Sequence, residues 1–527
     1  MTVSTSRPIA EALADVVVAR GADRVFGFPG GGTNLEVIGA CADRGLPFVL
    51  THAEGPAMTM ASVYGFMTGR PALAIAGRGP GCANSVNGVA GATLDRMPLV
   101  LCTDGVPSAD TGRIAHQQID QVGVMAPVTK WSGVLGLVEP QAVAEMAFEL
   151  AGSAPAGAVH MTIDPTTTMS RVPFAEMEAI SDAGVLAAAA NALGRSRRPV
   201  AIVGNGALGW ADQVDIALVR LGCPVLATYQ GVGIAPNPTQ FAGLYTGGEL
   251  EESLLDDADL IVAIGLDPVE PIPGPWRTAA PVISFCPSPL HHRYWPEFID
   301  LVGPVGPMIR QVVATAPEFE WDHDEGRRRY LDALAKLEPD PVVGLGPVDV
   351  VTTVAAAAPA RTLATVDAGA HFLAVMPWWR ATEPRSLLIS NGLATMGFAL
   401  PAAMGMALAR PGRPVVCFVG DGGLSMVLGE LETLARLALP VTVVVLDDAT
   451  LSLIQIKQGP KHGGPKVVRY LPTDFAGIAR AVGLPAVTVD NTADLAAALV
   501  GEWDHPRLIH AHIDPSGYRH LLKVTRG

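Results

Sequence analysis

Residues 415–448 read VVCFVGDGGLSMVLGELETLARLALPVTVVVLDD and contain two apolar runs that each end in acid. The first run, Val415–Val419, leads into Gly420-Asp421-Gly422, and the second, Val441–Leu446, leads into Asp447-Asp448. The residues between them, 428–437, are rich in leucine at helical spacing. A strand, a helix and a second strand in this order predict a βαβ unit whose two strands are parallel neighbours.

The acids after these two strands point to a ligand site. Neighbouring parallel strands end at the same edge of a sheet, which is where ligands bind in such folds. We therefore expect Asp421 and Asp448 to lie close together as oxygen ligands for Mg²⁺ or Ca²⁺, with a bound diphosphate completing the coordination. Gly420 and Gly422 would let the backbone approach the phosphates. The residues alone leave a second interpretation open, in which the acids only cap turns and helices.

The same alternation of short β-branched runs and Ala/Leu-rich stretches extends along the whole chain. With 527 residues and about 150 residues per domain, it predicts three domains. The predicted fold class is α/β, with three doubly wound parallel-sheet domains over residues 1–175, 185–337 and 347–527. The expected strands are 24–28, 47–50, 72–76, 99–103 and 158–163, then 199–204, 224–227, 260–264 and 282–285, then 362–367, 415–419, 441–446 and 508–513.

Composition excludes several classes of partner. A net charge of −15 and the lack of Lys/Arg runs argue against nucleic acid and against anionic membranes. No apolar stretch approaches the length of about 20 residues that a membrane span needs, and the first ten residues do not resemble a signal peptide. Six cysteines without C-x-x-C spacing predict free buried thiols, so we expect a cytoplasmic protein.

Two segments resemble a known enzyme family. The stretch from Gly420-Asp421-Gly422 to Asp447-Asp448 resembles the G-D-G…N-N motif of thiamine-diphosphate enzymes. Residues 390–401, SNGLATMGFALP, resemble the S-G-G-L-G-T-M-G-x-G-L-P segment of the acetolactate synthase branch. The resemblance covers nearly the whole chain. It implies a pyrimidine-binding domain, a middle domain and a diphosphate-binding domain, with thiamine diphosphate and Mg²⁺ as cofactors.

The resemblance assigns roles to residues of the third domain. Met396 matches the bulky residue that holds the cofactor in its bent conformation, and backbone groups near Gly392 and Ala394 would bond its aminopyrimidine. Asp421, Asp448 and Thr450 would ligate the metal. The expected cofactor-binding residues at the diphosphate are Gly420, Asp421, Gly422, Gly423 and Asp448.

In the first domain the resemblance singles out Glu54, within an H-x-E pattern. Its protonated carboxyl would donate to N1′ of the pyrimidine, a role that requires an apolar site which raises its pKa. Without the resemblance, Glu54 reads as an acid at a helix start. Pro29 and Gly30 match a loop that borders the active site in this family and are expected to bind the cofactor, and Gln117 matches an active-site glutamine. His116 replaces a Phe and is either a proton donor, a substrate contact or a solvent-facing side chain.

Three departures from the family concern Lys457, the middle domain and Asp448. Lys457 stands where acetolactate synthases have a Trp that shapes the acceptor pocket, so it either binds an anionic substrate group or is a surface lysine. The middle domain lacks the flavin-binding stretches of that branch and is either structural or binds a nucleotide or CoA moiety. At Asp448 the family has Asn, and the added negative charge should tighten divalent-metal binding.

The resemblance favours decarboxylation of a 2-oxo acid with carbon–carbon ligation, as in acetolactate synthases. The alternatives are a decarboxylase that does not ligate, a lyase of the benzaldehyde lyase type, and a non-catalytic binding protein with the same fold. The expected substrates are small 2-oxo acids or aldehydes. Because the activating Glu and the diphosphate site of this superfamily come from different subunits, a homodimer is implied, and it can pair into a tetramer.

Overall fold

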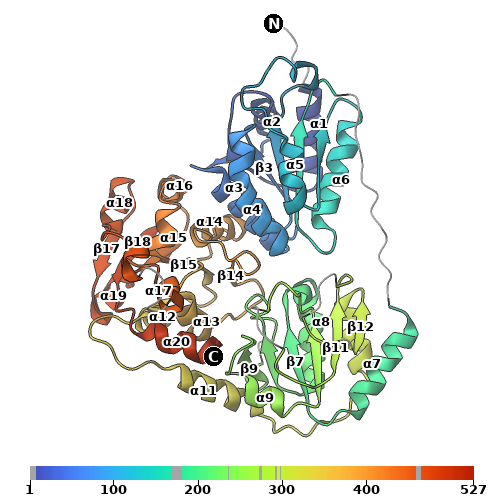
Figure 1. Ribbon diagram of the computed structural model, residues 1–527, viewed down its shortest axis with the longest axis vertical. Coiled ribbons are helices and arrows are strands. Elements are labelled where there is room, and N and C mark those ends of the chain that lie inside the picture. Colours follow the sequence, from blue (N-terminus) through green and yellow to red (C-terminus); the bar gives the residue numbers. More distant parts are fainter. Residues whose placement is uncertain are drawn as a thin grey trace.

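The computed structural model describes residues 7–167, 181–235, 237–271, 276–290, 294–296, 298–458 and 464–526. Figure 1 shows three α/β bodies, coloured blue to teal, green to yellow, and brown to red along the chain. Each contains a six-stranded sheet flanked by helices, and the paired strands within each sheet run parallel. The predicted class, an α/β fold with three parallel-sheet domains, is therefore confirmed.

The first sheet has the order β2-β1-β3-β4-β6-β5. Its central strands β3 and β4 are completely buried, which explains their uninterrupted apolar sequence. The strands are β1 (Val25–Phe28), β2 (Phe48–Leu50), β3 (Ala72–Ala76), β4 (Leu99–Asp104), β5 (Trp131–Leu135) and β6 (Ala158–Ile163). The helices are α1 (Arg7–Ala19), α2 (Thr33–Ala42), α3 (Glu54–Thr68), α4 (Pro80–Leu94), α5 (Gln121–Met125) and α6 (Pro140–Gly152).

The middle sheet has the order β12-β11-β10-β7-β8-β9. Its strands are β7 (Pro199–Val203), β8 (Val225–Ala227), β9 (Phe241–Leu244), β10 (Leu260–Ile264), β11 (Val282–Cys286) and β12 (Ile299–Val302). Its helices are α7 (Ala183–Arg195), α8 (Ala211–Leu221), α9 (Glu252–Asp256), α10 (Val305–Val313) and α11 (Glu325–Leu337). In Figure 1, α11 runs from this domain along the lower edge of the third.

The third sheet has the order β14-β13-β15-β16-β18-β17. Strands β15 and β16 are parallel neighbours, with Gly420 opposite Leu446, as the opening motif predicts. The strands are β13 (Leu363–Val366), β14 (Leu387–Ile389), β15 (Val415–Gly420), β16 (Val441–Asp447), β17 (Ala486–Val489) and β18 (Arg507–His512). The helices are α12 (Pro347–Ala357), α13 (Phe372–Trp378), α14 (Ala399–Ala409), α15 (Asp421–Ser425), α16 (Glu430–Leu437), α17 (Ser452–Gln458), α18 (Phe475–Ala481), α19 (Thr492–Ala498) and α20 (Gly517–Arg526).

The first and third domains meet through α3 and α14, which pack side by side (Figure 1). Nearly all of α14 is buried. The two backbones come close at Gly405, where an added Cβ would lie 2.6 Å from the carbonyl oxygen of Met60. Small residues at this crossing therefore set how the two domains are placed relative to each other.

One buried carboxylate connects all three domains. The Oδ1 atom of Asp95, after α4, accepts hydrogen bonds from the backbone nitrogens of Asn391 (3.0 Å) and Gly392 (2.7 Å) in the third domain. It also accepts one from Nε2 of Gln230 in the middle domain, at 3.2 Å. Asp95 is 1% exposed, and burial raises its pKa to about 6 although these donors oppose the shift. The loop that precedes α14 is thus held by a side chain of the first domain.

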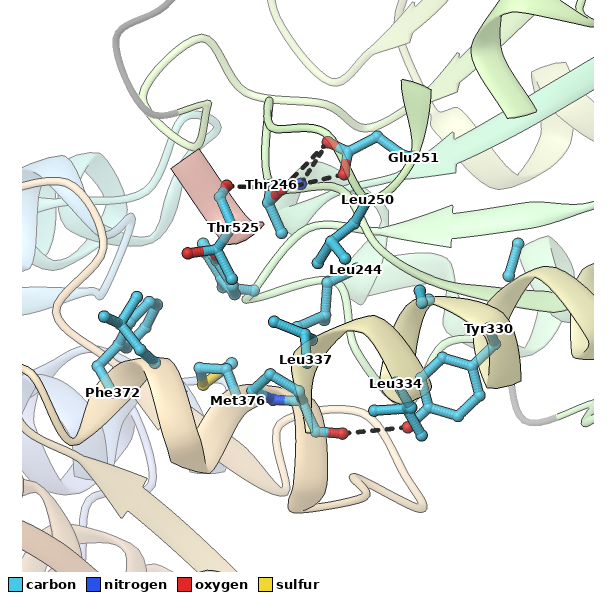
Figure 2. A pocket seen from close by; sticks show the side chains of 16 residues that line it. Leu244, Thr246, Leu250, Glu251, Tyr330, Leu334, Leu337, Phe372, Met376 and Thr525 are labelled. Carbon is cyan, nitrogen blue, oxygen red and sulfur yellow. Dashed lines mark hydrogen bonds between the residues drawn. The ribbon is translucent and has the colours of Figure 1, made fainter. Parts of the chain in front are cut away.

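The middle and third domains meet at an apolar void of about 30 Å³, enough for about one water molecule. Figure 2 shows Glu251 bonded to Thr246 on one side, with Thr525 of α20 beside them and the apolar side chains of α11 opposite. Tyr330 of α11 donates to the carbonyl of Pro377 in α13, at 3.1 Å. None of the predicted site residues lines this void, so it belongs to domain docking.

Two predictions about the chain as a whole concern its cysteines and its possible membrane spans. All six cysteines are free and buried, as expected. Among the described helices, none combines the length and the apolar character needed to cross a bilayer.

Candidate active site

The edge of the third sheet brings Asp421 and Asp448 together at the ends of β15 and β16. Burial, followed by the charge of Asp448, raises the pKa of Asp421 to about 7. Burial also raises the pKa of Asp448 to about 6. The Oδ2 atom of Asp421 is buried and has no hydrogen-bond partner among the described residues. Two crowded carboxylates with an unsatisfied oxygen suit a divalent cation such as Mg²⁺, so the donor set fits the predicted metal.

Hydrogen bonds and one left-handed residue fix the conformation of the loop that carries Asp448. Ala449 adopts the left-handed conformation (φ 51°), which turns the chain back toward Asp421. Its nitrogen donates to Asp447 Oδ1 (2.8 Å), while Asp447 Oδ2 pairs with Nε2 of the buried His510 (2.7 Å). Thr450 donates from its backbone nitrogen to Asp448 Oδ1, at 3.1 Å. The hydroxyl of Ser452 also donates to Asp448, so that carboxylate is already oriented.

The glycines after β15 are required by close contacts. A Cβ at Gly423 would lie 1.8 Å from Oδ2 of Asp367, and a Cβ at Gly422 would lie 3.3 Å from Cε of Met396. Met396 is therefore next to the predicted diphosphate loop, and its role in holding the bent cofactor stays a prediction. Asp367 in turn accepts from the backbone nitrogens of Gly397 (2.9 Å) and Phe398 (2.8 Å), so it fixes the segment that follows Met396.

Sequence reasoning missed His371 at this edge. The side chain is 4% exposed, and a Cβ at Gly420 would lie 3.1 Å from its Nδ1. Burial lowers the pKa of His371 to about 4, so the ring is neutral at pH 7. Its Nε2 is buried and lacks a partner among the described residues. Asp421 directly follows β15, whereas His371 lies beyond the turn after β13, at the N-cap of α13. The strand-end rule therefore points to Asp367 rather than to His371.

The loop predicted to contact the aminopyrimidine is partly committed to other contacts. The backbone nitrogen of Gly392 donates to Asp95, so this N–H is engaged within the chain and the carbonyl remains for a ligand. Ala394 is exposed and adopts a left-handed conformation, φ 53°, which L residues other than Asn and Asp rarely take. Where the family segment has glycine, this chain therefore accepts backbone strain. Contacts of Gly392 and Ala394 with a cofactor stay predictions.

In the first domain, Glu54 is the first residue of α3 and is partly open to solvent. Its Oε2 accepts a hydrogen bond of 3.3 Å from Nδ2 of Asn84. A Cβ at Gly81 would lie 3.3 Å from its Oε1, so the start of α4 packs directly against the carboxyl group. Asn84 therefore contacts the predicted catalytic acid and orients it.

The other predicted residues of the first domain surround the turn before α4. Gly30 lies against Gly77, with a Cβ at Gly30 only 3.1 Å from the Gly77 Cα, and Pro29 adjoins it. Gln117 lies against Gly79, since a Cβ there would meet the Gln117 carbonyl oxygen at 2.6 Å. Gln117 also has a left-handed backbone, φ 58°. His116 is exposed, which leaves its role open.

The two groups of residues approach each other through the turn before α3. The backbone nitrogen of His52 donates to Oε1 of Glu430 (2.9 Å), and its ring pairs with Glu432 (2.7 Å) at the start of α16. Within the part of the chain that is described, no hydrogen bond or ion pair joins Glu54 to Asp421 or Asp448. Lys457 is exposed on α17, apart from both groups of contacts. A single chain therefore contains both halves of a site without a direct bond between them.

Family models account for both halves in the observed order. Residues 7–124 match the N-terminal TPP binding domain of thiamine pyrophosphate enzymes, residues 186–312 their central domain, and residues 367–511 their C-terminal TPP binding domain. The chain belongs to the thiamine pyrophosphate enzymes. Thiamine pyrophosphate is thiamine diphosphate, so the cofactor predicted from the two motifs is confirmed. In this thiamine pyrophosphate enzyme, Glu54 and Gln117 lie in the N-terminal match, whereas Asp421 and Asp448 lie in the C-terminal one.

Curated relatives cover almost the entire length of this thiamine pyrophosphate enzyme. It is 28% identical to an acetolactate synthase of Bacillus subtilis, over 93% of this chain and 90% of the relative. It is also 28% identical to the acetolactate synthase isozyme 3 large subunit of Escherichia coli, over 98% of this chain and 96% of the relative. A probable acetolactate synthase large subunit of Methanocaldococcus jannaschii is 26% identical, over 96% and 92%.

Proposed function

We propose that this enzyme decarboxylates a 2-oxo acid and joins the remaining acyl unit to a second carbonyl compound, as an acetolactate synthase does. The names of its full-length relatives support this choice over a non-ligating decarboxylase or an acyloin lyase. The observation that carries it is the pairing of the buried carboxylate of Asp421 with the half-buried carboxylate of Asp448 beside Met396, in a chain that also places Glu54 at a helix start.

Bound thiamine diphosphate supplies a nucleophilic carbon and accepts the electron pair that CO₂ leaves behind. The residues of this chain hold and orient it. Asp421, Asp448 and Thr450 would ligate Mg²⁺, and the backbone of Gly420–Gly423 together with the neutral His371 would bind the diphosphate. His371 is suited to this role because its buried Nε2 has no other partner among the described residues.

Glu54 would hold a proton at N1′ of the pyrimidine, and Asn84 would keep its carboxyl in place. This function needs an apolar, water-excluding environment, but Glu54 is partly exposed in one chain. Phe28 and Leu50, at the ends of β1 and β2, are 37% and 39% exposed, and Met426 beside the diphosphate loop is 61% exposed. We propose that a second copy of the chain covers these apolar groups, so that the enzyme works as a homodimer, with a tetramer as the next assembly.

The middle domain is proposed to be structural. Nucleotide phosphates in doubly wound domains bind at backbone N–H groups after the strands. Here the carboxylate of Glu270 already accepts from the backbone nitrogens of Asn205 (3.0 Å) after β7 and Asp267 (2.9 Å) after β10. Burial raises the pKa of Glu270 to about 8, and no cation pairs with it among the described residues. A neighbouring hollow of about 660 Å³ runs between this domain and the first.

The six buried thiols favour a reducing compartment, and we place the enzyme in the cytoplasm.

The reaction is tested with purified protein, thiamine diphosphate, Mg²⁺ and pyruvate. We expect CO₂ release together with acetolactate, identified by mass and chirality. An aldehyde product without ligation would replace the proposal by simple decarboxylation. With cofactor bound, an absence of CO₂ from pyruvate and from a panel of other 2-oxo acids would refute it.

Lys457 is expected to influence anionic substrates in particular. Its exposed ammonium lies on α17, which follows the metal loop, so Lys457→Ala should raise the KM of a dicarboxylic 2-oxo acid more than that of pyruvate. Steady-state kinetics with both substrates measures the ratio. The matched control is Lys523→Ala, on α20. If Lys457→Ala leaves the substrate profile unaltered, Lys457 is a surface lysine.

A further inference from the structure

Three of the predicted site residues converge on residues 77–81, the turn after β3 together with the first residues of α4. Gly77 lies against Gly30, Gly79 against Gln117, and Gly81 against the carboxyl group of Glu54. The turn is fixed from behind by the buried Gln121, whose Oε1 accepts from the nitrogen of Gly79 at 3.0 Å. The charged side chain of this turn is Arg78, which stands between Gly77 and Gly79.

Arg78 lines a hollow of about 190 Å³ together with Gln117, Ser108 and Thr111. Among the described residues, no carboxylate lies within ion-pair distance of its guanidinium. Its charge acts at longer range on Asp104, where it opposes the rise in pKa that burial causes. Asp104 is itself committed, because its carboxylate accepts from the nitrogen of Asn34 at 2.5 Å and from Nδ2 of the same residue at 2.7 Å.

The acids that also line this hollow are engaged by backbone groups. Asp164 accepts from the nitrogen of Ser108 (3.0 Å) and from that of Thr166 (2.9 Å). Asp120 caps α5 by accepting from the nitrogen of Gly123, at 2.9 Å. The guanidinium of Arg78 and the amide of Gln117 have no such partner among the described residues. The hollow therefore offers donors for an anion, one turn away from Glu54.

We propose that Arg78, assisted by Gln117, binds the carboxylate of the accepting 2-oxo acid and so selects an anionic acceptor over a neutral aldehyde. This inference rests on the proposed function, since it names the acceptor class for that reaction. Guanidinium is a planar fork that bonds a carboxylate through two parallel N–H groups, which lysine cannot reproduce. Gln117 has a left-handed backbone conformation, which is strained for this residue type. Such strain is retained at functional sites, where it positions a side chain.

The first test compares an anionic acceptor with a neutral one in the same reaction. In Arg78→Gln, the KM for a 2-oxo acid acceptor should rise about 10- to 100-fold, the effect expected when a charged hydrogen-bonding partner is lost. The KM for benzaldehyde as acceptor, and the dissociation constant of thiamine diphosphate, should change less than about twofold. Arg78→Lys should restore part of the affinity. Arg113→Gln, an exposed arginine that pairs with Asp110 in the same loop region, is the matched control.

The second test does not depend on turnover. Oxamate, an unreactive analogue of a 2-oxo acid, and its neutral amide oxamide are titrated calorimetrically into the wild-type and Arg78→Gln holoenzymes. We expect the wild type to bind oxamate and the variant to bind it with an affinity lower by about tenfold or more. The affinity for oxamide should be the same in both proteins. Equal losses for both probes, no loss for oxamate, or no binding of oxamate to the wild type would each overturn the assignment of Arg78. If oxamate binding depends on Arg78 but no 2-oxo acid is decarboxylated, the proposed function fails while the anion site stands.

Discussion

Replacement of Glu54 by glutamine is expected to reduce turnover by roughly 100- to 10,000-fold, the range in which a positioned acid–base group contributes. Glutamine can still donate a hydrogen bond from the same position, but it has no acidic proton to exchange with the pyrimidine. Because Glu54 lies in the first domain and the diphosphate residues lie in the third, the dissociation constant of thiamine diphosphate should change little. CO₂ release and calorimetric cofactor titration measure the two quantities independently.

The control for this substitution is Glu149→Gln, which removes an exposed acid from α6 of the same domain. It should leave both quantities unchanged. The turnover of Asn84→Ala should lie between those of Glu54→Gln and Glu149→Gln. The 3.3 Å hydrogen bond from Asn84 to Glu54 orients the carboxyl group but takes no part in proton exchange. Wild-type turnover in Glu54→Gln would contradict the assigned mechanism.

The second large effect is expected at the metal site. Asp421 is 7% exposed and one of its oxygens lacks a partner among the described residues, so its carboxylate has few contacts other than the cation. Asp421→Asn should weaken Mg²⁺ binding in the presence of thiamine diphosphate by about 100-fold, roughly 3 kcal/mol, and turnover should fall with it. Mg²⁺ titration of chelator-stripped protein gives the affinity.

Asp448→Asn is the informative comparison, because it restores the family residue at this position. An amide oxygen can still ligate Mg²⁺ and accept from the nitrogen of Thr450, so we expect the variant to keep turnover while its Mg²⁺ affinity falls by about tenfold, as one negative charge is lost. Asp504→Asn, an exposed acid of the same domain, controls for net charge. If Asp421→Asn and Asp448→Asn had equal and small effects, the metal would have to be held elsewhere.

The strands that could be predicted and those that could not differ in their place in the sheets. Central strands such as β3, β10 and β15 are fully buried and therefore appear as continuous apolar runs. The strands absent from the prediction are β5, β9, β12, β14 and β17, and each of them is an edge strand. Edge strands face solvent or a loop on one side, so their sequences mix polar and apolar residues.

The residues of the candidate site also divide into those that the sequence can predict and those that it cannot. Asp421 and Asp448 could be predicted because they directly follow apolar strands that are neighbours in the sequence. Asp95 could not, because its role depends on Asn391, which is far away along the chain. Arg78 could not be predicted for a different reason: the contacts of its turn with Glu54 and Gln117 exist only in the folded chain.

The bond pattern of Asp95 has a consequence for how such an enzyme diversifies. Asp95 fixes the loop before α14 from a position shared by three domains, so a substitution there disturbs cofactor geometry and domain docking together. Arg78 and Lys457 make no contact with it among the described residues. On the roles proposed for Arg78 and Lys457, a lineage can exchange these two side chains in single mutational steps and acquire a new acceptor while the chemistry of the cofactor is inherited unchanged.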